Sequence, residues 1–97
     1  MLPILIAEQL VHPFKFCLEV QVCQGMRYDS EIYGLVTEFA PKDRLKAYQK
    51  ACELNEQGLS VVATASPQRY AIWLNLRLPD AKKWLFSKSE ILTSLPQ

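Results

Sequence analysis

The chain has 97 residues, of which 49% are hydrophobic and 22% charged, and its formal net charge is +1. This composition is that of an ordinary globular protein and argues against disorder, and the length predicts one domain over residues 1–97. The near-neutral charge also argues against the strongly basic face expected of a protein that binds duplex nucleic acid.

The charges are unevenly divided along the sequence. Residues 1–40 contain five acidic and two basic residues, whereas residues 41–97 contain five acidic and nine basic residues. An acidic half joined to a basic half favours either ion pairs within the chain or association between complementary surfaces.

The first candidate element spans residues 3–11. Pro3 suits the first turn of a helix, and Ile6 and Leu10 share one face of that helix, so a short helix is predicted, with a strand as the alternative. The element should end at His12, because a residue that precedes proline is disfavoured in helical geometry.

Two alternating segments follow and predict an antiparallel hairpin. Residues 16–22 alternate apolar side chains with polar ones and Cys17, until Gly25 and its neighbours interrupt the pattern. Residues 32–39 form the second predicted strand, after a polar stretch at residues 29–31. Gly34 within this strand indicates a bulge or a close backbone approach.

The central helix is predicted over Pro41–Gln57. Pro41 is tolerated in the first helical turn, and Gly58 can adopt the left-handed conformation that ends a helix. One stripe of the helix is expected to face the core, and its members are Leu45, Tyr48, Ala51, Cys52 and Asn55. Leu54 lies off this stripe.

A second hairpin and a tail complete the predicted fold. Residues 59–65 and 70–76 alternate as strands around a four-residue loop, and Asp80 can cap a C-terminal helical segment, either one bent helix or two short ones. The predicted fold class is therefore α+β: an antiparallel sheet of about four strands, in ββαββ order, with the Pro41–Gln57 helix on one face and the C-terminal helical segment after it.

No group of residues in the sequence has the spacing of a metal, cofactor or catalytic site. On a single strand the α-carbons of Cys17 and Cys23 would lie about 20 Å apart, which is too far for both to bind one metal ion. His12 is the only histidine of the sequence, so no pair of histidine ligands is present. Cys52 lies mid-helix, away from the helix N-terminus that activates many reactive cysteines. We therefore expect no catalytic residue, no metal and no cofactor. An enzyme built around Cys52 or His12 is the least favoured hypothesis.

The expected location is the cytoplasm. The apolar first ten residues lack the basic region and cleavage site of a secretory signal, and no apolar run is long enough to span a bilayer. An odd number of cysteines without such a signal predicts reduced thiols.

Apolar residues on the nominally outer faces exceed what one small core easily hides. Such residues mark partner surfaces, unless helices cover both faces of the sheet. The candidates for a partner interface are Leu54, Val62, Trp73, Trp84 and Phe86. The sequence thus predicts a small protein–protein interaction or regulatory module without catalytic activity, acting as a homodimer or as an accessory subunit of a larger protein partner.

The alternative function is binding of single-stranded nucleic acid. Its candidate contacts are Lys42, Arg44, Lys46, Lys50 and Arg69. Strand alternation places Tyr70 and Trp73 on opposite faces, so the two rings cannot form one stacking platform.

Overall fold

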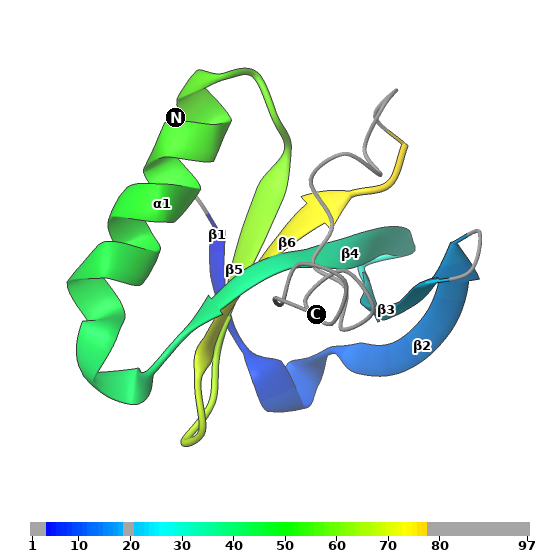
Figure 1. Ribbon diagram of the computed structural model, residues 1–97, viewed down its shortest axis with the longest axis horizontal. Coiled ribbons are helices and arrows are strands. Elements are labelled where there is room, and N and C mark those ends of the chain that lie inside the picture. The colour runs from blue at the N-terminus through cyan, green and yellow to red at the C-terminus, as the bar shows by residue number, and fades with distance from the viewer. Residues whose placement is uncertain (1–3, 19–20, 78–97) are drawn as a thin grey trace, which may run out of the picture.

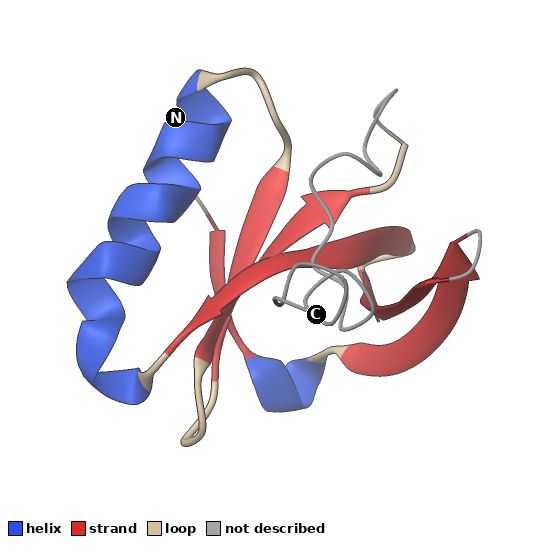
Figure 2. Cartoon of the chain, in the orientation of Figure 1, coloured by secondary structure: helices blue, strands red, loops and turns tan. Residues whose placement is uncertain are grey.

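The computed structural model describes residues 4–18 and 21–77, which form one six-stranded sheet with a single α-helix packed on it (Figure 1). Strands dominate, and the remaining regular structure in these residues is two short 3-10 helices, η1 and η2, and the helix α1, as Figure 2 shows. The elements in chain order are β1 (Ile4–Ala7), η1 (Glu8–Leu10), β2 (His12–Leu18), β3 (Gln21–Tyr28), β4 (Glu31–Phe39), η2 (Pro41–Asp43), α1 (Arg44–Glu56), β5 (Val61–Ala65) and β6 (Tyr70–Asn75). Neither α1 nor the 3-10 helices are long and apolar enough to cross a bilayer, a finding that concerns these described residues alone.

The sheet is mixed and not antiparallel throughout. Its strand order is β1-β5-β6-β4-β3-β2, and β1 pairs with β5 in parallel while every other pair is antiparallel. The predicted four-stranded antiparallel sheet in ββαββ order is therefore wrong. The predicted C-terminal helical segment lies in residues 78–97, outside the described part of the chain.

Two of the six strands were missed for identifiable reasons. The N-terminal segment, predicted as a short helix, is instead the extended β1 followed by η1. The segment predicted as one strand over residues 16–22 is divided between β2 and β3, so that Phe16 faces Cys23 across the hairpin. The first error arises because a short apolar run fits helix and strand patterns equally well. The second arises because the alternation of side chains continues without a break through residues 16–22.

Gly25 lies inside β3 and does not end a strand as predicted. It pairs with Phe14, and a Cβ atom at Gly25 would come within 2.7 Å of the Phe14 ring. The glycine therefore provides space for an aromatic ring to lie flat across the sheet.

The two edge strands of the sheet are consecutive in the sequence. β1 and β2 occupy opposite edges, yet only residues 8–11 connect them. Because a residue spans at most about 3.6 Å, the sheet must curl to bring its edges together at this end. Figure 1 shows β2 sweeping round below the other strands.

This curl buries the apolar residues that the sequence left on an outer face. The concave side of the sheet holds one core cluster, made of Ile6, Val11, Met26, Tyr33, Leu35, Val62, Ala71 and Trp73. The central strand β6 is consequently buried on both faces, with Ala71 and Trp73 on one and Ile72 and Leu74 on the other.

The helix covers the opposite, convex face. Its buried residues are Ala47, Ala51 and Leu54, which pack over β5 and β6. The predicted core stripe was thus rotated on the helix: Leu45 and Tyr48 are exposed, whereas Leu54 is fully buried. Gly58 has φ +88° and ends the helix as predicted.

Candidate functional site

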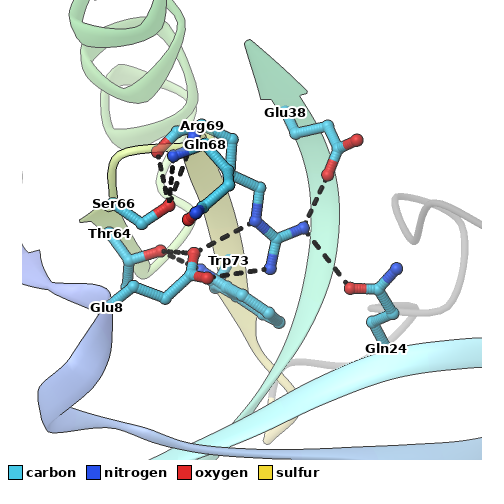
Figure 3. A network of polar contacts seen from close by, with 8 residues as sticks. All are labelled: Glu8, Gln24, Glu38, Thr64, Ser66, Gln68, Arg69 and Trp73. Carbon is cyan, nitrogen blue, oxygen red and sulfur yellow. Dashed lines mark hydrogen bonds and ion pairs between the residues drawn. The ribbon is translucent and has the colours of Figure 1, made fainter. Parts of the chain in front are cut away.

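The most connected group of polar side chains centres on Arg69 at one mouth of the concave face (Figure 3). Arg69 Nε donates to Glu8 Oε1 at 3.1 Å and Arg69 Nη1 donates to Glu38 Oε2 at 2.6 Å. Arg69 Nη1 also lies 3.4 Å from Gln24 Oε1, and the guanidinium carbon is 5.6 Å from the centre of the Trp73 ring. We call Glu8, Gln24, Glu38, Thr64, Arg69 and Trp73 the Arg69 network.

Thr64 extends this network into the core. Trp73 Nε1 donates to Thr64 Oγ1 at 2.8 Å, and Thr64 Oγ1 donates to Glu8 Oε1 at 3.0 Å. The fully buried Thr64 hydroxyl therefore accepts a hydrogen bond from the indole N–H and donates one to a carboxylate.

A bulge in β4 brings Glu38 into the network. The register of β4 against β6 shifts between Leu35 and Thr37, which leaves Val36 as the extra residue. The shift reverses the alternation, so Glu38 pairs with Ala71 on the concave side instead of pointing toward the helix. The sequence indicated a bulge near Gly34, but no pattern linked it to Arg69.

The Arg69 network joins distant elements but presents little unused charge. Burial lowers the pKa of Arg69, and the hydrogen bonds and ion pairs with Glu38 and Glu8 outweigh this effect and raise it above its ordinary value. The guanidinium is held by two carboxylates, so it is poorly placed to contact phosphate. The network connects η1, β3, β4 and the β5–β6 hairpin, and its geometry is that of a structural clasp.

Part of the charge difference between the two halves of the sequence is compensated by ion pairs among the described residues. The acidic half supplies Glu8, Glu38 and Glu31, and the basic half supplies Arg69 and Arg77 as their partners. Of the two alternatives that the sequence left open, the structure contains the intramolecular one.

A second feature is an apolar hollow beside the edge strand β1. It has a volume of about 480 Å³ and lies between β1 and the first turns of α1. Its walls are Ile4, Leu5, Arg44, Leu45, Tyr48 and Tyr70. Ala47, Ala51 and Ala63 form its floor. We call this hollow the edge groove.

The edge groove exposes large apolar side chains. Leu45 is 68% exposed, Ile4 and Leu5 are 54% exposed each, and Tyr48 is 45% exposed. A groove of this volume lined by apolar atoms is typical of a binding site. The sequence placed Leu45 and Tyr48 on one helical stripe, but assigned that stripe to the core.

The predicted interface residues are not gathered at this groove. Leu54, Val62 and Trp73 are each about 1% exposed and belong to the two core clusters. Trp84 and Phe86 lie outside the described residues.

The five basic residues proposed to contact nucleic acid have different neighbours and do not form one group. Lys46 lies 4.0 Å from Asp43 and Lys50 lies 3.5 Å from Glu53. Lys42 is exposed on η2, Arg44 borders the edge groove, and Arg69 is held inside the Arg69 network.

The three cysteines differ in their exposure to solvent. Cys17 is exposed, Cys23 is buried and Cys52 is half-buried. Cys17 and Cys23 are on neighbouring strands, so the expected 20 Å separation along one strand does not apply, although they still point to opposite faces. Within the described ranges, no cluster of three or more histidine, cysteine or acidic residues is placed to hold a metal ion.

Comparison of the chain with protein-family models, with curated proteins and with solved structures gave no match.

Proposed function

We propose that this chain is a small, non-catalytic protein–protein interaction module that docks a partner polypeptide at the edge groove. The observation that carries the proposal is the coincidence of exposed apolar side chains with the outer edge of β1, which pairs with no further strand among the described residues. A contiguous apolar patch on a protein surface is often functional, and a patch rimmed by polar residues is typical of an interaction site.

The side chains and the backbone favour the same kind of partner. Leu5, Leu45 and Tyr48 offer apolar contacts, while the outer edge of β1 offers backbone N–H and C=O groups to an extended segment. Addition of a strand to an exposed edge uses both: the backbone supplies hydrogen bonds and the neighbouring pockets supply specificity.

Site-specific photocrosslinking in cells that produce the chain tests this proposal. A photoreactive phenylalanine analogue at Leu45 should yield a covalent adduct with a polypeptide, and the same analogue at Gln49 provides the control on an exposed helical position that does not line the groove. The adduct at position 45 should be lost when Leu5 is also replaced by Asp, because the charge enters the groove. No adduct at position 45, or equal adducts at both positions, would refute docking at the groove.

A further inference from the structure

We infer that the partner is a second copy of this chain, joined by antiparallel pairing of the two β1 strands about a two-fold axis. The two six-stranded sheets then form one continuous sheet, and the two edge grooves close against each other. This inference rests on the proposed function and names the partner that the edge groove accepts.

The two edges of the sheet differ in their protection against pairing. The edge strand β2 contains Pro13 and Lys15, which are residues that natural proteins use to prevent edge-to-edge association. The edge strand β1 has the sequence Ile-Leu-Ile-Ala, with no charge and no proline. Within the described residues its only strand partner is β5, so its other edge remains open.

An isologous pairing suits a strand of this composition. In a two-fold interface each surface meets its own copy, so the surface must be self-complementary. An uncharged apolar strand meets this requirement, because no like charges face each other across the axis. Pro3 precedes β1 and has no N–H, which confines the new ladder to about the length of β1. The side chains must therefore supply most of the affinity.

The exposed apolar area is close to what a stable dimer needs. At about half exposure, Leu5, Leu45 and Tyr48 on the helix side of β1 and Ile4 on its other face each leave on the order of 100 Å² in solvent, or roughly 400 Å² per copy. A stable interface buries roughly 800 Å² per partner, of which about 60% is non-polar, or roughly 500 Å². The edge groove thus supplies most of the apolar part of such an interface.

The charges near the groove offer little opposition to a second copy. Arg44 is the one charged residue among those described that line the groove, and it is at the exposed rim. The net charge of +1 per chain produces only weak repulsion between two copies.

Light scattering coupled to size-exclusion chromatography over a concentration series tests the inference. The wild-type chain should have twice its monomer mass at micromolar concentration. Leu5→Asp and Leu45→Glu should each raise the dissociation constant at least about 30-fold, because each would bury a charge in the centre of the interface. Val22→Asp is the matched control, since Val22 is similarly exposed but lies on β3. Circular dichroism of each variant verifies folding, and Leu45 lies on an exposed helical face where a charge is tolerated. A monomeric wild-type chain, or a dimer that Val22→Asp disrupts while Leu45→Glu does not, would overturn the inference.

Disulfide trapping tests the pairing of the strands. In a Cys17→Ser background, Leu5→Cys should form an intermolecular disulfide under mild oxidation, because a residue near the two-fold axis meets its own copy. Phe14→Cys, on the edge strand β2, should not form one. Trapping at position 14 but not at position 5 would contradict pairing through β1.

The photocrosslinking experiment separates the two proposals. An adduct at position 45 with twice the monomer mass supports both the proposed function and the second copy. An adduct with a different polypeptide leaves docking at the groove intact but overturns the second copy, and the lack of any adduct overturns both.

Discussion

Replacing Arg69 by Ala should destabilise the fold by about 2–3 kcal/mol. The ion pair with Glu8 is partly shielded from water and contributes about 1–2 kcal/mol, whereas the more exposed pair with Glu38 contributes about 0.5 kcal/mol. The contact with the Trp73 ring adds about 0.5 kcal/mol. For a chain of this size the loss corresponds to a fall of about 10–20 °C in Tm.

Arg77 provides a matched control for this prediction. Arg77 Nε lies 3.0 Å from Glu31 Oε2, but its side chain is 77% exposed, against 20% for Arg69. Arg77→Ala should therefore cost at most about 0.5 kcal/mol. Urea denaturation of the two variants, with a double-mutant cycle between Arg69→Ala and Glu8→Gln, measures the difference. Equal losses for the two arginines, or no coupling between Arg69 and Glu8, would refute the view that the Arg69 network fastens the curled sheet.

Three further substitutions test local features of the fold. Ser30→Gly should stabilise the chain by about 1 kcal/mol, because Ser30 has φ +65° in the two-residue turn between β3 and β4 and glycine relieves that strain. Thermal denaturation measures the change, and an unchanged Tm would contradict this prediction. Thr64→Val should cost about 1–3 kcal/mol, because the buried Trp73 N–H loses its acceptor, and the indole fluorescence should change with it. Gly25→Ala should cost about 1 kcal/mol because the Phe14 ring must move, and the same substitution in a Phe14→Ala background should cost less, because only the 3.2 Å approach of the Phe16 ring then remains; equal costs in both backgrounds would argue against the contact with Phe14.

The features that the sequence predicted correctly are those set by local chemistry. Gly58 ends the helix in a left-handed conformation. The four-residue loop at residues 66–69 is present, where the Ser66 hydroxyl accepts from the backbone N–H groups of Gln68 and Arg69. Pro41 opens the helical region in η2. Each of these depends on a few neighbouring residues, so the sequence pattern was sufficient.

The features that the sequence did not predict depend on the curvature of the sheet. Val62 and Trp73 had the alternation of an outer face, and only the curl that joins β1 to β2 makes that face an interior. The position of Glu38 on the concave face was also not predictable, because it depends on the bulge at Val36. Leu45, predicted to face the core, is exposed, and Leu54, predicted to face a partner, is buried. The helix leaves β1 uncovered, and helical spacing alone does not determine which of two apolar stripes packs on the sheet.

The parallel pairing of β1 with β5 has a consequence for how the chain acquires its structure. β1 precedes the other described strands in the sequence, but its partner β5 follows only after the helix, whereas the hairpins β2–β3 and β3–β4 pair strands that are neighbours in the sequence. Because closing so long a loop costs more conformational entropy than forming a hairpin, we expect β1 of an isolated copy of the chain to dock last and to detach first. Amide hydrogens of Leu5 and Ile6 should accordingly exchange with solvent faster than those of Ile72 and Trp73.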